Sequence, residues 1–356
     1  MHSVSIGKSF GPITVLGLSI VASVAIAQTT STAAQTASTA TKVRAYADSH
    51  RPEIIEEYLQ LLSANNLHGN VEGLQKNADL LVQMMKKRGV QAEEWPTSTG
   101  VPVVFGQKLV PGATRTILFY IHFDGQPVAP KRWQQEDPWK PVVRTDSIEA
   151  GGEVVKDLSH AEYPDAWRIY ARSAGDDKVP IESLLCALDA LKSLQKVNVK
   201  IVLHGEEEGG SPRGDGLGEA IAKYPDKLKS DLLVVLDGPQ HPSGRPTIYY
   251  GARGGAGVEV TVYTARQGMH SGNYGNWQPD ANVRLAQLIS SMLDATGKVV
   301  IPGFYSDVLP FSPAARAMMA AVADNSAQMQ KDFGVGSLDG AASSLQEGLN
   351  LSLIHI

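Results

Sequence analysis

Apolar residues recur along the chain with two different periods. Apolar side chains lie three and four residues apart in residues 51–64 (RPEIIEEYLQLLSA), 71–89 (VEGLQKNADLLVQMMKKRG) and 180–194 (PIESLLCALDALKSL). This spacing predicts three amphipathic helices, and Gly89 predicts the end of the second.

Three short, continuous apolar runs alternate with helical segments. They are residues 116–124 (TILFYIHFD), 199–205 (VKIVLHG) and 232–238 (LLVVLDG). Runs of this length predict buried strands, and strands that alternate with helices need crossover connections. The sequence therefore predicts an α/β domain built on a mostly parallel sheet.

A different pattern follows Arg253. Residues 257–265 (GVEVTVYTA) alternate valine with polar side chains, which predicts a half-exposed antiparallel strand, and residues 280–296 again have helical spacing. We expect a second, smaller α+β domain from about residue 254. The glycine-rich stretch 251–257 (GARGGAG) is interpreted as a turn, because a dinucleotide-binding loop would open a helix rather than precede a strand.

The N-terminal segment predicts export. Lys8 precedes an apolar run that closes with Ala-Ile-Ala, the pattern of a signal peptide over residues 1–27 with cleavage after Ala27. An uncleaved membrane anchor is the alternative. Residues 28–47, rich in Thr, Ser and Ala, are interpreted as a disordered linker. The mature protein is expected to be periplasmic or secreted, with no stable membrane span.

The length, charge and cysteine content of the chain exclude several kinds of partner and site. The 356 residues, 43% of them apolar, are enough for a large hydrophobic core. A formal net charge of −5 provides no electrostatic footprint for nucleic acid, which we exclude as a partner. Because Cys186 is the single cysteine, an internal disulfide framework and a cysteine-based zinc cage are both excluded.

Acidic residues and a histidine follow the predicted strands. The three runs end in His122–Asp124, Glu206–Glu208 and Asp237, and the loop before helix 180–194 contains Asp176–Asp177. Because the carboxyl ends of parallel strands share one edge, we expect these side chains to lie close together. Any one pair alone is more typical of a structural or solvated site. Packed together, the acids would repel one another and lose solvation, so their placement favours a bound cation.

The residue types indicate the kind of metal. Imidazole and carboxylate ligands without a thiolate suit zinc, manganese or cobalt. Asp124 follows His122 by two residues, so it faces the same side of the strand and can accept the second ring N–H. A carboxylate can bridge two cations, and an additional glutamate can take a proton from a water between them.

Six segments of the chain carry a family resemblance. They are YIHFDGQPV, AGDDKVP, HGEEEGGS, LDGP with IYYGARGG, QGMHSGNYGN and GKVVIPGFYSDV. In this order they resemble the M20 metallopeptidases, which include carnosine dipeptidases, glutamate-releasing carboxypeptidases and aminoacylases. The likeness is greatest to the carnosinase and non-specific dipeptidase branch and runs from about residue 50 to 310. It implies a zinc-peptidase catalytic domain with an inserted lid and dimerisation domain.

The resemblance implies a set of metal ligands. His122 and Asp237 would bind one metal, and Glu208 would bind a second. Asp176, joined to Asp177 by a cis peptide bond, would bridge both. The cofactors would be two divalent ions, zinc first, with manganese and cobalt as alternatives.

The resemblance also implies roles in catalysis. Glu207 would be the general base that activates water and later protonates the leaving amine, and Asp124 would orient His122. His270, in the lid domain, would reach across a homodimer to polarise the scissile carbonyl of the peptide. Glu206 is expected to be merely solvated.

The chain departs from the family pattern at three positions. Ile121, Gly125 and Val179 stand where the family has glycine, valine and glycine. None is a ligand, but each shapes the cleft and leaves the substrate side chains open. Trp133 and Trp139 match cleft-wall positions loosely, and packing explains them equally well.

The C-terminal segment lacks one expected ligand. The family takes a histidine for the second metal from a segment after the lid, and none lies between His270 and residue 350. The terminal LSLIHI is interpreted as non-native, so the chain is expected to be a fragment. The predicted divisions are a signal peptide (1–27), a linker (28–47), a catalytic domain (48–253), a partial lid domain (254–350) and the tail (351–356).

These inferences predict an exported, dinuclear metal-dependent hydrolase that cleaves dipeptides or removes C-terminal residues from small peptides. Asp at position 237 favours a dipeptidase. The alternatives are an N-acyl amino acid amidohydrolase, a catalytically incomplete fragment of such an enzyme, and a binding or dimerisation module without activity. Glu207 argues against the last, because a binding module needs no general base.

Overall fold

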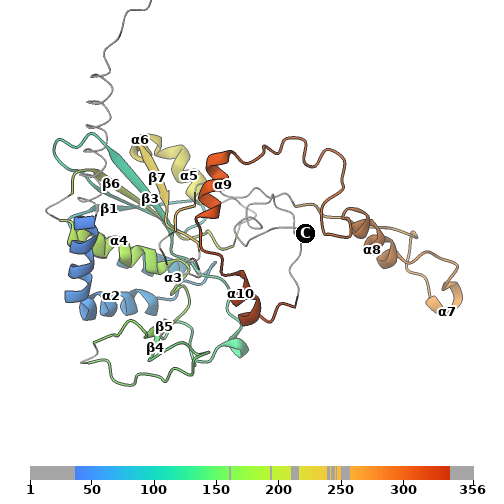
Figure 1. Ribbon diagram of the computed structural model, residues 1–356, viewed down its shortest axis with the longest axis horizontal. Helices are drawn as coiled ribbons and strands as arrows, with labels where there is room; N and C mark the ends of the chain where they lie inside the picture. The colour runs from blue at the N-terminus through green and yellow to red at the C-terminus, as the bar shows by residue number, and fades with distance from the viewer. Residues whose placement is uncertain are drawn as a thin grey trace, which may run out of the picture. The chain divides into compact units, whose positions relative to one another are not determined.

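The computed structural model forms two compact units, Met1–Pro239 and Gln240–Ile356 (Figure 1). Their division lies N-terminal to the predicted boundary near residue 254. The predicted signal peptide, the tail and the glycine-rich turn lie outside the described residues. Those residues are 37–159, 162–192, 195–209, 216–238, 241, 245, 247–249 and 257–336.

The described part of the chain begins with helices. Residues 37–49 are helical, which differs from the linker expected there, and alanine, the strongest helix former, recurs through them. Helices α2 (Arg51–Ser63) and α3 (Val71–Lys87) lie where they were predicted. Helix α3 ends at Lys87, and Gly89 follows its C-cap with a φ of +71°, the left-handed conformation that commonly terminates helices.

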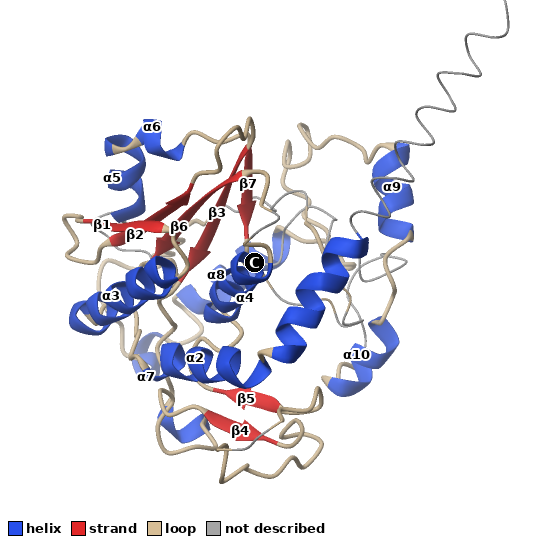
Figure 2. Cartoon of the chain, turned by 90° about the vertical axis from the view of Figure 1, so that its left-hand side faces the viewer, coloured by secondary structure: helices blue, strands red, loops and turns tan. Residues whose placement is uncertain are grey.

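The first unit is built on a five-stranded mixed sheet with the order β1-β2-β6-β3-β7 (Figure 2). The three predicted strands, β3 (Thr116–His122), β6 (Asn198–His204) and β7 (Leu232–Val235), run parallel to one another. The expectation that all three are buried was wrong for β7, which pairs with β3 on one side only among the described strands and is mostly exposed. Strands β1 (Gln91–Trp95) and β2 (Val103–Lys108) were not predicted, and they extend the sheet in antiparallel pairs. The α/β prediction with a mostly parallel sheet is confirmed.

Helices cover both faces of this sheet. Helices α3 and α4 (Lys178–Ala190) pack against one face, and α5 (Gly216–Lys223) and α6 (Pro225–Leu228) lie on the other (Figure 2). Alternate side chains of β6 enter the two cores, because successive strand residues point to opposite faces. On the second face, Trp95 stacks between Phe105 and Tyr224, with ring centroids 4.5 and 4.2 Å away.

The register of the parallel strands determines where along the sheet the candidate site lies. His122 at the end of β3 lies opposite His204 at the end of β6, and Tyr120 lies opposite Val235 at the end of β7. The three strands therefore end at nearly the same level. The chain segments that leave them enter one shared region.

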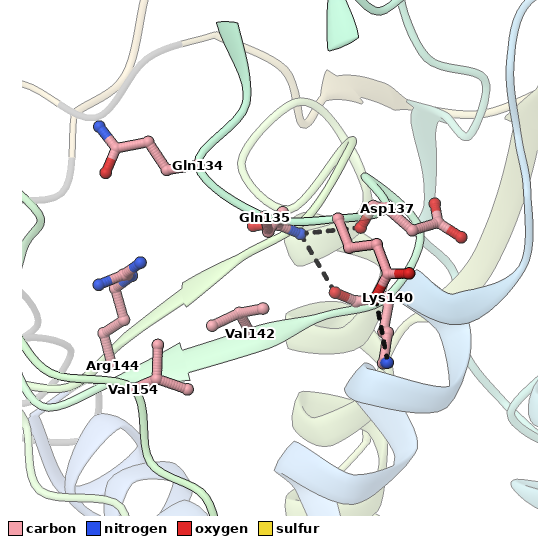
Figure 3. Close-up of a pocket in the computed structure, with 8 residues that line it drawn as sticks. Gln134, Gln135, Asp137, Lys140, Val142, Arg144 and Val154 are labelled. Carbon is pink, nitrogen blue, oxygen red and sulfur yellow. Dashed lines mark hydrogen bonds and ion pairs between the residues drawn. The ribbon is translucent and has the colours of Figure 1, made fainter. Parts of the chain in front are cut away.

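A separate two-stranded antiparallel sheet, β4 (Val142–Arg144) with β5 (Arg168–Tyr170), lies in the same unit. A 3₁₀ turn, Pro130–Arg132, precedes it. A cavity of about 240 Å³ lies beside β4, and Gln135, which lines it, donates from Nε2 to the carbonyls of Asp137 and Lys140 at 3.1 Å each (Figure 3). The cavity contains none of the predicted site residues.

The second unit contains α7 (Ser271–Tyr274), α8 (Ala281–Ser291), α9 (Pro313–Ala320) and α10 (Ser326–Asp332). Helix α8 was predicted. The strand predicted over 257–265 was wrong, because those residues form no strand and find no pairing partner in the described part of the chain. Alternating valines favour an extended segment, but a strand also needs a neighbour to accept its hydrogen bonds.

No helix within the described residues has both the length and the apolar composition that a membrane crossing requires.

Helix α4 contains a buried carboxyl group. The side chain of Glu182 is 3% exposed, and neither of its oxygens has a hydrogen-bond partner among the described residues. Burial, together with the negative charge of Glu57, raises its pKa to about 7, although the Arg88 cation opposes the shift. Between the ordinary pKa and pH 7 the folded protein keeps a proton that the unfolded chain loses. The free energy of unfolding therefore falls as pH rises through this window.

Replacing Glu182 by Gln should remove this pH dependence. At pH 8 we expect the free energy of unfolding of Glu182→Gln to exceed that of the wild type by roughly 2–4 kcal/mol, and the difference to shrink towards pH 5. Urea unfolding at both pH values measures it, with the exposed Glu53→Gln as a control. An equal difference at both pH values would contradict the linkage.

Candidate metal centre

The imidazole of His122 lies at the centre of the site. It is the last residue of β3 and is 1% exposed. Its Nε2 atom lies 2.9 Å from Oδ1 of Asp176, on the side of the acidic cluster. Its Nδ1 atom lies 3.3 Å from Oδ1 of Asp124, an ion-pair distance at which the N–H is not aligned for a hydrogen bond. The two ring nitrogens thus face different groups.

Two sets of ligand atoms converge on this imidazole. One comprises His122, Asp176 and Glu208, and the other comprises His122, Asp177 and Asp237, with the ligand atoms of each set within 4.8 Å of one another. The structure thus brings all four predicted ligands together. It differs from the prediction in placing Asp177, rather than Asp176, with Asp237. The peptide bond between the two aspartates is cis, as the resemblance implies.

The electrostatics of the cluster suit a cation. Burial raises the pKa of Asp177 to about 8, and the charges of Asp237 and Asp176 add to this effect against the opposing influence of His122. Burial alone would lower the pKa of His122, but Asp124, Asp177 and Asp176 raise it to about 9. The pKa of Asp177 is raised mainly by burial, and that of His122 by the carboxylates around it. One imidazole and several carboxylates fit a divalent ion such as zinc or manganese.

Asp124 connects the imidazole of His122 to the turn of residues 207–209, here called the glutamate turn. Its side chain has no exposed surface, and its two oxygens accept the backbone N–H groups of Glu207 at 3.2 Å and Glu208 at 3.0 Å. His68 Nδ1 lies 3.0 Å from its Oδ2 atom. Burial would raise the pKa of Asp124, but these hydrogen bonds and the neighbouring His122 hold it below its usual value. The carboxylate therefore stays ionised.

The turn at 207–209 presents two glutamates in different settings. Glu208 is half-buried, and its carboxylate accepts a hydrogen bond of 2.7 Å from Nε2 of Gln126. Glu207 is exposed, and partial loss of solvation with the charges of Glu208, Asp237 and Asp124 raises its pKa despite the opposing effect of His122. A carboxylate with a raised pKa is a better proton acceptor, as general base chemistry requires.

The expectation for Glu206 was wrong. Its side chain is buried, 7% exposed, and its carboxylate accepts hydrogen bonds of 2.9 Å from the Thr99 hydroxyl and from the backbone N–H of residue 216. Three consecutive glutamates look equally solvated in a sequence. A turn that leaves a strand can direct one of them back into the protein, and here Glu206 anchors the turn that carries the other two.

Several residues of the site were not found from the sequence. His68 lies in a loop outside the quoted motifs, and no pattern marks it. Gln126 lies within the YIHFDGQPV segment but was given no role. The Asp177 carboxyl was named only as a neighbour of Asp176, although both belong to one motif. Trp139 donates from Nε1 to Oδ1 of the buried Asn66 at 3.0 Å, which gives it a packing contact beside the site.

His270 lies in the second unit, which is described by itself. It occupies the position before α7, where its Nδ1 atom accepts the backbone N–H of Gly272 at 3.0 Å. The role implied for it across a dimer stays a prediction.

Comparison with known proteins decides the family. Residues 118–355 match the model of peptidase family M20/M25/M40. The chain belongs to this family. The match confirms the resemblance carried by the six ordered motifs.

Two curated relatives of this M20 chain are dipeptidases. It is 30% identical over 223 residues to the human Beta-Ala-His dipeptidase, covering 60% of this chain and 39% of that protein. It is 28% identical over 262 residues to the Cysteinylglycine-S-conjugate dipeptidase of Corynebacterium striatum, covering 71% of this chain and 52% of that protein. The chain thus spans about half, or less, of the length of these relatives.

Solved structures share the fold. The M20 family metallo-carboxypeptidase Sso-CP2 from Sulfolobus solfataricus matches with a TM-score of 0.61 and 27% identity, over 83% of this chain and 62% of that one. Human carnosine dipeptidase 1 matches with a TM-score of 0.58 and 21% identity, over 86% of this chain and 63% of that one. The second likeness is evidence of the fold alone.

Removing the Glu206 carboxylate should destabilise the protein. Glu206→Ala leaves the Thr99 hydroxyl and the N–H of residue 216 without their acceptor, so we expect the free energy of unfolding to fall by about 2–3 kcal/mol. Glu136→Ala, which removes an exposed carboxylate, is the matched control and should change it by less than about 0.5 kcal/mol. Equal effects in denaturant unfolding would show that Glu206 does not anchor the turn.

Proposed function

We propose that this protein is an exported, dinuclear metal-dependent hydrolase that cleaves the peptide bonds of dipeptides or releases C-terminal residues from small peptides. The observation that carries the proposal is the convergence of two three-residue ligand sets on the single imidazole of His122. His122 would bind one cation through Nε2, and the carboxylates of the two sets are numerous enough to hold a second cation beside it. Export rests on the signal-peptide pattern of the first 27 residues.

The relatives support a peptide substrate. Beta-Ala-His dipeptidase, Cysteinylglycine-S-conjugate dipeptidase and a metallo-carboxypeptidase are all named for cleavage of peptides. These names favour a peptidase over an N-acyl amino acid amidohydrolase, which is the alternative from the sequence. We extend peptides as a substrate class to this protein, without specifying which side chains the substrate carries.

The residues of the site would divide the chemistry among them. When bound, divalent cations would lower the pKa of a water molecule and polarise the scissile carbonyl. His122, Asp176, Glu208 and Asp237, with Asp177, would hold the cations. Glu207 would accept a proton from the attacking water and deliver it to the leaving amine, a role that suits its exposure and its raised pKa.

Two further roles belong to the same proposal. Asp124 would keep the proton on Nδ1 of His122, so that Nε2 stays free to bind metal. His270 would polarise the carbonyl of a substrate bound in the partner subunit of a homodimer. Both roles carry over from the family motifs.

Replacing Glu207 by Gln should abolish turnover and leave metal binding intact. The amide keeps the size of the side chain but cannot accept a proton, so kcat for a dipeptide should fall by at least about 100-fold. Metal content, measured by mass spectrometry on the same preparation, should equal that of the wild type. Glu136→Gln is the control, and unchanged turnover in Glu207→Gln would contradict the mechanism.

Removing the metal should stop the reaction reversibly. We expect chelation to eliminate hydrolysis of dipeptides, and Zn²⁺, Mn²⁺ or Co²⁺ to restore it, because carboxylate and imidazole ligands accept all three. The metal content at full activity should be two ions per chain. A panel that contains dipeptides and N-acyl amino acids separates the two substrate classes, and hydrolysis of acyl amino acids alone would favour the amidohydrolase.

A further inference from the structure

The loop between α2 and α3 brings a second histidine to the site. His68 lies outside every acidic motif, and its side chain is 21% exposed. Its backbone N–H donates to the carbonyl of Gly125 at 2.9 Å, and the N–H of Gly125 donates to Asn66 at 2.9 Å. This pair of hydrogen bonds attaches the loop to the chain just after β3, where His122 and Asp124 lie.

The imidazole of His68 makes two contacts with the metal-binding region. Nδ1 lies 3.0 Å from Oδ2 of Asp124, the oxygen that also accepts the N–H of Glu208. On the other side, a Cβ atom added to Gly209 would lie only 1.9 Å from Nε2 of His68. The ring therefore fills the space between the buried carboxylate and the backbone that follows Glu208.

We infer that His68 is a positioning residue for the metal centre, acting through Asp124 and the glutamate turn. The inference rests on the proposed function, because it concerns the binding of the metal ions. The N–H at Nδ1 of His68 donates to Oδ2 of Asp124. This hydrogen bond holds the carboxylate in an orientation in which it faces both His122 and the turn. The ring of His68 sets how closely the turn approaches, which determines where the Glu208 carboxylate lies.

The orientation of ligands controls metal affinity. Partners that orient a ligating histidine or carboxylate commonly contribute roughly 10- to 100-fold to affinity when they are removed. His68 reaches two ligands at once, His122 through Asp124 and Glu208 through the turn. Loss of the His68 side chain should therefore weaken metal binding without removing any ligand.

The first test compares three variants of the full chain by titration with Mn²⁺. His68→Ala removes donor and ring, and its Mn²⁺ affinity should fall by roughly 10- to 100-fold. His68→Asn places an amide N–H at the same distance from Cβ as Nδ1, so it should recover most of the affinity. His50→Ala, at an exposed histidine in the N-terminal part of the chain, is the control.

A second measurement excludes a merely structural effect. With Co²⁺ in place of Mn²⁺, the visible absorption bands report the ligand geometry, and they should shift in His68→Ala but return in His68→Asn. Thermal unfolding of each variant without metal shows whether the fold is retained. A spectral shift in a variant that unfolds at the wild-type temperature locates the effect at the ligands.

The contact with Gly209 provides a third test. Gly209→Ala should weaken Mn²⁺ binding in the wild type, because the new methyl group meets the ring of His68. In His68→Ala the ring is absent, so the same substitution should have little further effect. This non-additivity is expected only if the two residues act through one contact.

The outcomes separate the two proposals. If the wild type binds Mn²⁺ and His68→Ala binds it equally well, with unchanged Co²⁺ bands, His68 has no positioning role while the proposed function stands. Equal losses in His68→Ala and His68→Asn would also contradict positioning through the donor. If the wild type itself binds neither ion, the proposed function and the inference fail together.

Discussion

The carboxylate of Asp124 is the group on which the rest of the site depends. It lies within the protein with no exposed surface, and a buried charge is costly unless hydrogen bonds replace its water shell. Here the hydrogen bonds come from two chain segments, the loop before α3 and the turn after β6. The imidazole of His122, at the end of β3, lies 3.3 Å from the same carboxylate. Satisfying one charge therefore fixes the relative positions of the imidazole and both glutamates.

This arrangement is made available by the sheet. Parallel pairing of β3 with β6 and β7 ends the three strands at nearly one level, so the segments that follow them are close without any long excursion of the chain. The helices on both faces hold the strands through two separate cores. The ligands thus come from a rigid support, which is what a site with strict distances requires.

The sequence predicted the parts of this design that follow from period and composition. Strands β3, β6 and β7 are continuous apolar runs, so pattern alone was sufficient to locate them, although β7 is mostly exposed. Strands β1 and β2 carry mixed residues such as QAEEW, which have no clear period. The segment 257–265 has the alternation of a strand and yet forms none. Alternation is a property of a single segment, whereas a strand needs a second segment to pair with.

The residues of the site also divide into those that the sequence predicted and those that it did not. Its acids were predicted because strand ends meet at one edge, a property of topology. Which of two adjacent acids turns inward is decided by local backbone geometry, and the sequence contains no periodic signal for it. Glu206 and Asp177 are therefore the residues whose surroundings were misjudged. His68 was missed for a related reason, since its contact joins segments 56 residues apart.

The charge balance of the centre bears on the proposed pair of cations. Four carboxylates, those of Asp176, Asp177, Glu208 and Asp237, surround one imidazole. The cation adjacent in sequence, Lys178, does not compensate them, because its Nζ donates instead to the carbonyls of Leu61 and Ala64 and to the Asn77 amide oxygen. Those bonds satisfy the end of α2 and leave the acids to other partners. The proposed pair of divalent ions would match these four carboxylates, and without a cation the buried Asp177 keeps its proton.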